Sequence, residues 1–348
     1  MIGSRFLNPF LSWYFRGFRK GKSLPFEYAG HHCPFPGEND SWEKSETISS
    51  EDGHGIHVYQ TLPGKDCEVV AILIFIPPNP LDGRWFAHLG KDLSSGGIAV
   101  FTFDLRGHGN SDGRRGHTGS YERVLCDIDL VVGYGRRVVM EHHKNRKRND
   151  LATCNLDSRT KALYIGGIGL GGLLASEYAY QHQESCQGLV VFSPYSTHDL
   201  SWWSNGVTLF CSTLCPCLRV WRSEDCLHMQ SRNLAVAIAL CKDPMVTRQV
   251  ATWGTWRQVD RLTRKVSGMV SKLKIPILYI HGLRDVISNP KGSHYWHQQV
   301  PGRLREIMIL KNGWHNSLLE PEAQHVLDKV KTWIQRDLEW NLLESSLD

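Results

Sequence analysis

The sequence has no long apolar run. Nowhere in its 348 residues does a stretch approach the ~20 consecutive apolar residues that a membrane-spanning helix needs, so we expect no transmembrane segment. A secretory signal pattern is lacking as well, and the ten cysteines are irregularly spaced. These features argue against a disulfide framework and favour a reduced, cytoplasmic setting.

The chain has no excess of positive or negative charge after its first 22 residues. The net charge of +5 comes from the first 22 residues, which hold five basic side chains and no acidic one. The other 326 residues balance 35 basic against 35 acidic side chains. A nucleic-acid-binding face needs a clustered basic stripe, so we expect no nucleic acid partner. The only other basic run, "KNRKR" at 144–148, is interpreted as a solvated loop.

Residues 1–22 interleave aromatic side chains with their basic ones. This combination is typical of a segment that inserts apolar groups into a membrane surface and is attracted to anionic lipid, so we expect peripheral membrane association. Two alternatives stay open: a mitochondrial transit peptide, which would also be Arg-rich and free of acids, and an arm packed on the domain. Residues 1–46 are therefore interpreted as a basic aromatic N-terminal segment followed by an irregular connector.

From residue 47 the chain alternates strand-like and helix-like segments. Continuous β-branched and aromatic runs, typical of strands buried on both faces, occur at 69–77, 97–107, 162–169, 188–194, 275–282 and 305–313. Amphipathic helix candidates lie between them. The alternation predicts an α/β fold with a doubly wound, mostly parallel sheet, its core formed by 47–194 and 273–348. Residues 195–272 contain no convincing core strand and are predicted to be an inserted cap (lid).

The predicted cap has an apolar, aromatic and cysteine-rich start. Its segment 199–221 carries Trp202, Trp203, Phe210 and Trp221, as expected of a lid over an acyl pocket or of a second membrane-touching surface. The spacing of its cysteines and of a nearby histidine fits no common zinc pattern, so we expect no metal; these residues are Cys211, Cys215, Cys217, Cys226 and His228. Buried or lipid-facing thiols are favoured over S-acylated ones.

Chemistry-bearing residues follow the last two predicted strands. Ligand sites in such sheets lie at the carboxyl ends of the strands. There, "HGLRDVISNP" and "NGWHNSLLE" place Asp285 and His315 in the order of the acid and histidine of an α/β-hydrolase triad. Upstream, "GIGLGGLLA" has the strand, tight turn and helix of a nucleophile elbow. However, no Ser, Cys, Thr, Asp, Lys or His lies between Leu163 and Ala175.

Four ordered motifs resemble those of the monoglyceride lipase and lysophospholipase branch of the α/β-hydrolases, also called serine aminopeptidase-like. They are "FDLRGHGNSDG" at 103–113, "DPMV" at 243–246 in the cap, and the two loops around Asp285 and His315. The likeness extends over 69–340. It implies the α/β-hydrolase fold with a cap, no cofactor, and an acyl lipid or monoacylglycerol-like ester as ligand.

The sequence departs from this family at two positions. The family's elbow reads Gly-His-Ser-Met-Gly-Gly, which places its nucleophilic serine on Gly169 and the residue of one oxyanion amide on Leu170. Glycine cannot attack a carbonyl, although it suits a strained turn. Counting back from "GRW" at 83–85, the other oxyanion donor falls on Pro78, which has no N–H. Losing one such donor costs about 10²–10³ in rate, and losing the serine of a triad costs about 10⁶.

Three functional hypotheses follow. The favoured one is a catalytically impaired lipase-like protein that binds an acyl lipid, or a protein partner, through the inherited pocket and cap. The second is a hydrolase in which the His315 and Asp285 dyad activates water. The third is a membrane-attached interaction module whose pocket has closed. Replacement nucleophiles are not expected. Ser176 and Ser193 are interpreted as packing or capping residues, and Cys154 lies before the strand, on the far side of the sheet by connectivity.

We predict that deleting residues 1–22 moves the protein from membranes to the soluble fraction without unfolding it. These residues hold the whole net charge and precede the predicted core. Fractionation of cells that express either form measures the shift, and high salt should weaken attachment of the full chain because salt screens the electrostatic part. An unchanged membrane fraction after deletion would assign the attachment to the cap.

Overall fold

The computed structural model describes residues 40–65, 67–147, 162–196, 202–219, 227–248 and 250–345, all within one unit, Phe35–Asp348. The predictions made for segment 1–22, Cys154, Trp221 and Cys226 concern residues outside these ranges. Among the described helices, none combines the length and apolar character needed to cross a bilayer.

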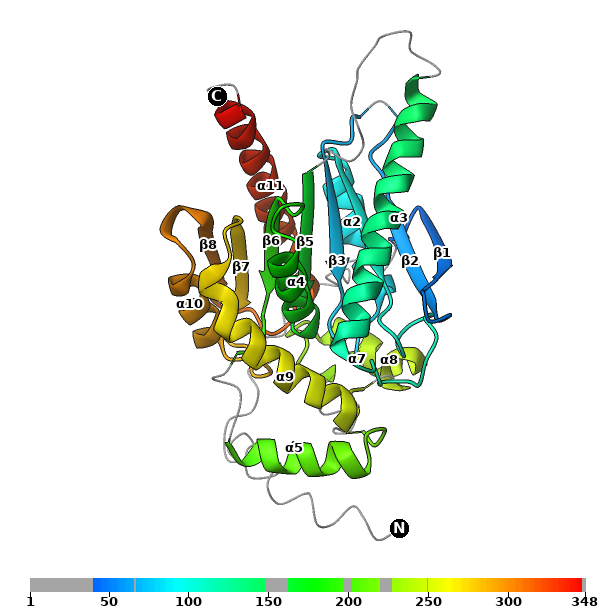
Figure 1. Cartoon of the computed structure of the whole chain (residues 1–348), viewed down its shortest axis with the longest axis vertical. Helices are drawn as coiled ribbons and strands as arrows, with labels where there is room; N and C mark the ends of the chain where they lie inside the picture. The colour runs from blue at the N-terminus through cyan, green and yellow to red at the C-terminus, as the bar shows by residue number, and fades with distance from the viewer. Residues whose placement is uncertain are drawn as a thin grey trace. The chain divides into compact units, whose positions relative to one another are not determined.

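An eight-stranded sheet forms the centre of the described chain, in the order β1-β2-β4-β3-β5-β6-β7-β8 (Figure 1). The strands are β1 (Lys44–Ser49), β2 (Gly55–Thr61), β3 (Ala71–Ile76), β4 (Ile98–Phe103), β5 (Ala162–Ile168), β6 (Gly188–Phe192), β7 (Ile277–Gly282) and β8 (Arg305–Leu310). All pairings from β4 through β3 to β8 are parallel, whereas β1 and β2 add an antiparallel edge. The doubly wound, mostly parallel sheet predicted from the sequence is therefore confirmed.

Helices cover both faces of the sheet. They are α2 (Ala87–Ser94), α3 (Tyr121–Lys147), α4 (Leu170–Gln181), α10 (Pro290–Gln299) and α11 (Ala323–Ser345), with short 3₁₀ turns η1 (Gly83–Phe86), η5 (Gly302–Leu304) and η6 (Ser317–Leu319). Figure 1 shows α3 and α4 in front of the strands and α2 behind them. The basic run at 144–148 corrects one expectation, because residues 144–147 end α3 rather than form a loop. Cations at a helix C-terminus are favoured by the helix dipole.

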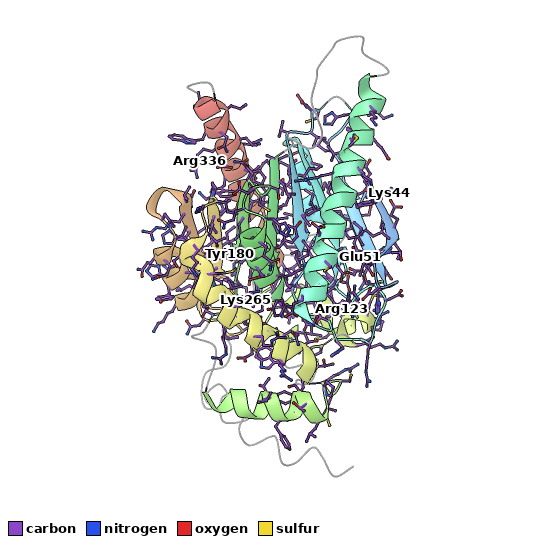
Figure 2. All side chains as sticks on the ribbon, in the orientation of Figure 1. Lys44, Glu51, Arg123, Tyr180, Lys265 and Arg336 are labelled. Atoms are coloured by element: carbon purple, nitrogen blue, oxygen red, sulfur yellow. The ribbon has the colours of Figure 1, made fainter. Side chains whose placement is uncertain are left out.

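Two hydrophobic clusters, one on each face, explain why the strands read as continuous apolar runs. Successive side chains of a strand point to opposite faces. In β3, Ile72, Ile74 and Ile76 join the cluster that contains α3 and α4, whereas Leu73 and Phe75 join the cluster that contains α2 and α11. Charged side chains such as Lys44, Glu51 and Arg336 lie on the outside (Figure 2).

Helices are the main elements in the described part of the segment between β6 and β7. It contains α5 (Trp202–Leu214), α7 (Leu234–Lys242), α8 (Pro244–Arg248), α9 (Trp253–Met269) and η4 (Val270–Lys272), and one isolated β-bridge joins Arg219 to Thr252. Helix α9 contacts both α4 and α5, and its Val259 and Leu262 enter the core cluster of the α3 and α4 face. The predicted cap segment therefore ends in a helix that is packed in the core.

Close backbone packing at the start of α4 predicts a strong effect of Gly171→Ala. A Cβ there would lie 2.1 Å from the carbonyl oxygen of Ile76 and 2.7 Å from that of Pro77. Because backbone atoms cannot rotate aside, we expect this overpacking to lower the free energy of unfolding by about 1–3 kcal/mol or more, measured by urea denaturation.

A matched control is Gly133→Ala in α3, where a Cβ would meet nothing within 4 Å. There the better helix propensity of alanine should raise the free energy of unfolding by up to about 1 kcal/mol. Equal effects of the two substitutions would mean that the end of β3 does not press on α4.

Candidate functional site

The turn from β5 into α4 has the geometry of a nucleophile elbow. Gly169 lies between the strand and the helix with φ +55° and ψ −113°, in the left-handed region that ordinary side chains avoid. Its N–H donates to the carbonyl of Phe192 at 3.0 Å, and its own carbonyl accepts from Leu173 N–H at 3.1 Å. The packing is tight, since a Cβ on Gly167 would lie 2.5 Å from Gly171 backbone atoms. The strained, glycine-dense turn therefore forms where the sequence indicated.

Asp285 and His315 come together opposite this turn. Asp285 lies in the loop after β7 and His315 in the loop after β8, and both side chains are buried. His315 Nδ1 lies 2.9 Å from Asp285 Oδ2. Loop backbone orients the carboxylate, because its Oδ1 accepts from the N–H groups of Ile287 at 2.7 Å and Ser288 at 3.0 Å.

A second histidine, which the sequence analysis did not single out, shares the same carboxylate. His281 Nε2 lies 3.1 Å from Asp285 Oδ2, and His281 Nδ1 lies 2.6 Å from Ser293 Oγ. Ser288 Oγ also donates to Asp285 Oδ2 at 2.8 Å. The signal was a polar residue at the end of the apolar run "IPILYIHG", four positions before Asp285.

These contacts determine the charge state of Asp285. Burial acts to raise the pKa of this carboxyl, but interactions with His315 and His281 outweigh it and hold the pKa of Asp285 well below its ordinary value. Asp285 is therefore a carboxylate at neutral pH, and it orients the imidazole of His315 in the way that a triad acid does.

Within the described residues, the side of His315 that faces the elbow has no hydrogen-bond partner. His315 Nε2 is buried and makes no hydrogen bond within the described part of the chain. A Cβ built on Gly169 would lie 3.0 Å from this nitrogen. The structure thus brings together Gly169, His315 and Asp285. A side chain at position 169 would point toward Nε2 of His315.

The two positions assigned to the oxyanion hole lie on segments that border the elbow. Leu170 is the first residue of α4, and Pro78 follows β3 by two residues; both are buried. The carbonyl oxygens of Ile76 and Pro77 lie against Gly171. The segment after β3 therefore borders the start of α4, and its Pro77 and Pro78 contribute no N–H.

Aromatic residues cover the elbow from the side of the cap. The Tyr195 ring lies 6.0 Å from the His315 ring, and Tyr195 Cε2 would lie 3.5 Å from a Cβ on Gly169. Trp256 of α9 packs edge-on against Tyr195, with ring centroids 5.8 Å apart. Tyr195 was missed from the sequence because no pattern distinguishes it from an ordinary core residue.

The serines considered as replacement nucleophiles are placed differently. Ser176 Oγ donates to the carbonyl of Gly172 at 2.7 Å, a contact within α4. Ser193 is buried, has φ +41°, and its Oγ has no hydrogen-bond partner within the described ranges. Its carbonyl oxygen lies 3.0 Å from Ser288 Oγ, so the end of β6 is close to the Asp285 loop.

Carboxylates also join the cap segment to the core and to the loop that carries His315. Glu320 accepts from the N–H groups of Trp314 at 2.9 Å and Arg232 at 3.2 Å, and burial raises its pKa to about 7. Arg84 Nη2 donates to both Asp82 and Asp243, at 2.8 and 2.9 Å, and so joins the core to the "DPMV" segment.

The cap cysteines that are described form no metal cluster. No group of three or more His, Cys, Asp or Glu side chains suited to a metal occurs in the described ranges, where Cys211, Cys215 and Cys217 are free thiols. Cys241 Sγ lies 3.8 Å from His228 Nε2.

Comparison with known proteins gives a family match and several relatives. The model of the family described as serine aminopeptidase, S33 (Hydrolase_4) matches residues 82–322. The chain is 24% identical over 254 residues to a monoacylglycerol lipase of Mycolicibacterium smegmatis, covering 72% of this chain and 83% of that protein. It is 25% identical over 268 residues to a monoglyceride lipase of Saccharomyces cerevisiae, covering 70% and 78%.

Solved structures show the same fold. A soluble variant of the Saccharomyces cerevisiae monoglyceride lipase superimposes with a TM-score of 0.68 at 19% identity, covering 86% of this chain and 97% of that one. The monoacylglycerol lipase of Paleococcus ferrophilus gives a TM-score of 0.66 at 20% identity, covering 81% and 99%. The predicted α/β-hydrolase fold is therefore confirmed.

The low pKa of Asp285 predicts a pH-dependent cost of Asp285→Asn. Near pH 7 we expect the substitution to lower the free energy of unfolding by about 1.5–3 kcal/mol, the range for hydrogen bonds to a charged group. Because the folded-state pKa lies below the unfolded value of about 4, this contribution is present above that pH and is lost as the pH falls. Urea denaturation of the native protein and of Asp285→Asn, from pH 7 to below the unfolded-state pKa, measures the difference in their free energies of unfolding.

Glu51→Gln is the control, since Glu51 is exposed. It should leave stability unchanged at every pH. If the difference in free energy of unfolding between the native protein and Asp285→Asn stayed constant down to acidic pH, the low pKa of Asp285 would be contradicted.

Proposed function

The chain belongs to the serine aminopeptidase S33 family of α/β-hydrolases, and on this premise we propose that it is a monoglyceride lipase-like protein that binds an acyl lipid at its elbow without serine-based ester hydrolysis. The ligand class is suggested by the relatives, which are named monoacylglycerol or monoglyceride lipases. The aromatic and apolar residues of the cap and elbow, including Tyr195 and Trp256, suit an acyl chain.

One observation carries the proposal. The residue at the elbow, opposite an oriented histidine, is Gly169, and a Cβ there would lie 3.0 Å from His315 Nε2. In a serine triad the histidine takes a proton from the nucleophile at this position. Glycine has no proton to give and no atom to attack with, so the acyl-enzyme route is closed.

The loop after β3 supports the same conclusion. An oxyanion hole needs N–H donors directed at the developing charge. Pro77 and Pro78 cannot supply them, and the carbonyl oxygens of Ile76 and Pro77 border the elbow instead. Of the two expected donors, only the N–H of Leu170 remains.

A second candidate function is hydrolysis by an activated water. The partnerless Nε2 of His315 and the carboxylate of Asp285 favour it, since a histidine oriented by a carboxylate is a competent general base. This route still lacks one oxyanion donor, so we place it second.

Membrane contact completes the proposal. Residues 1–22 and the cap are proposed to hold the protein at a membrane surface on the cytoplasmic side. Support from the described residues comes from the cap, where exposed apolar side chains gather on and just after α5, namely Leu209, Phe210, Leu214 and Leu218. A membrane-attached interaction module with a closed pocket is the alternative, and lipid retained through purification would count against it.

Restoring a serine at position 169 tests the proposal that both the nucleophile and one oxyanion donor are missing. The native protein should neither bind fluorophosphonate covalently nor hydrolyse monoacylglycerol through a serine. Gly169→Ser should fold with a loss of about 1–3 kcal/mol at most from backbone strain and become labelled by the probe. Its ester turnover should remain about 10²–10³ below that of a complete site because one oxyanion donor is missing.

Adding Pro77→Gly and Pro78→Ala provides the matched comparison. These two changes should raise turnover more in the Gly169→Ser protein than in the native background, because nucleophile and oxyanion donors act on one transition state. Full lipase-like turnover by Gly169→Ser alone would refute the assignment of Pro78. Specific labelling of the native protein, lost on His315→Ala, would refute the assignment of Gly169.

A further inference from the structure

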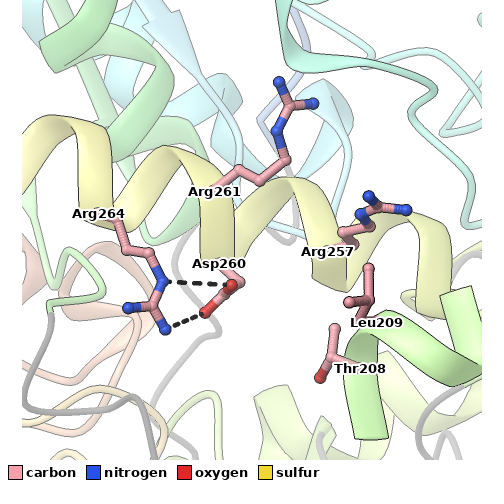
Figure 3. Close-up of a pocket in the computed structure, with 6 residues that line it drawn as sticks. All are labelled: Thr208, Leu209, Arg257, Asp260, Arg261 and Arg264. Carbon is pink, nitrogen blue, oxygen red and sulfur yellow. Dashed lines mark hydrogen bonds and ion pairs between the residues drawn. The ribbon is translucent and has the colours of Figure 1, made fainter. Parts of the chain in front are cut away.

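A cavity separate from the elbow lies between two helices of the cap segment. Its volume is about 310 Å³, and Thr208 and Leu209 of α5 line it together with four residues of α9, Arg257, Asp260, Arg261 and Arg264 (Figure 3). The α9 residues recur at spacings of three and four, so they share one stripe of the helix. Three of these four side chains are arginines.

The charges of this stripe are only partly compensated. Arg264 pairs with Asp260, at 3.2 Å between Nη2 and Oδ1. Arg261 Nη2 donates to Glu122 at 3.0 Å, and the Arg261 guanidinium lies 5.2 Å above the Tyr121 ring.

Arg257 differs from both. It is half-buried, and no hydrogen bond or ion pair engages its guanidinium within the ranges that the structure describes. Among the described residues, Arg257 is therefore a partly desolvated cation of the cavity without a compensating charge, which favours an anionic ligand.

The surroundings of the cavity specify the kind of anion. Leu209, which lines it, is 54% exposed, and Phe210 and Leu214 on the same helix are 64% and 63% exposed. An exposed apolar patch beside an unpaired arginine matches a molecule with an anionic head and apolar chains. The planar guanidinium suits the oxygens of phosphate, to which it can donate in a bidentate manner.

We propose that the cavity between α5 and α9 binds the phosphate group of an anionic membrane lipid, with Arg257 as its main ligand and the exposed face of α5 in the lipid layer. The site does not depend on the chemistry at Gly169, and Gly169→Ser should leave it intact. The cavity is close in sequence to the aromatic residues above the elbow, because Trp256 precedes Arg257 in α9 and packs on Tyr195.

The test compares binding of the full chain to phosphatidylcholine vesicles with and without phosphatidic acid. Arg257→Gln should weaken binding to the acidic vesicles about fivefold or more, the loss expected for one arginine at an anionic surface. Binding to pure phosphatidylcholine should not change. Arg257→Lys should recover part of the loss, since it keeps the charge but not the planar guanidinium.

Arg248→Gln is the matched control, because Arg248 is an exposed arginine of α8 outside the cavity and its loss removes the same charge. Equal weakening by the two substitutions would overturn the proposal in favour of diffuse charge attraction, and no weakening by Arg257→Gln would overturn it directly. A binding measurement with inorganic phosphate distinguishes a lipid site from a site for free anions. If Arg257→Gln abolished phosphate binding but left vesicle binding unchanged, the lipid assignment would be overturned.

Discussion

The turn from β5 into α4 is the constraint on which the rest of the site depends. A Cβ on Gly167 or on Gly171 would collide with backbone atoms, so the strand, the helix and the end of β3 approach as closely as bare backbone allows. This approach fixes residue 169 in a left-handed conformation and directs it at His315. The geometry follows from the flanking glycines and needs no serine.

The hydrogen bonds of Asp285 explain why the Asp285 and His315 pair is stable whichever residue occupies position 169. A buried carboxylate is stable only when hydrogen bonds replace its lost water. Two histidines, Ser288 and two backbone N–H groups serve this purpose here, and they tie together the loops after β6, β7 and β8. Any change to Asp285 or His315 would leave buried polar atoms without partners, so stability alone is enough to retain the dyad.

The sequence predicted the parallel strands and the order of the site residues, but little of what surrounds them. Burial on both faces leaves an apolar run that stands out, as in β3 and β4. In contrast, β1 is a polar edge strand with no such run. His281 and Tyr195 become recognisable only once folding brings them to Asp285 and His315. Arg257 gave no signal at all, because whether a charge is compensated depends on which residues folding brings near it.

The energetics of position 169 explain how a glycine can occupy an elbow of this geometry. Glycine avoids the strain of about 1–3 kcal/mol that an ordinary side chain meets in this conformation. Against this, His315 Nε2 is left buried without a partner in the described chain, a cost of about 1–3 kcal/mol. The two effects have opposite sign, so the net cost of Gly169→Ser for folding should be smaller than the strain energy alone. Under the function proposed above, His315 Nε2 receives its hydrogen bond from a polar group of the bound acyl lipid, and the lipid is held rather than cleaved.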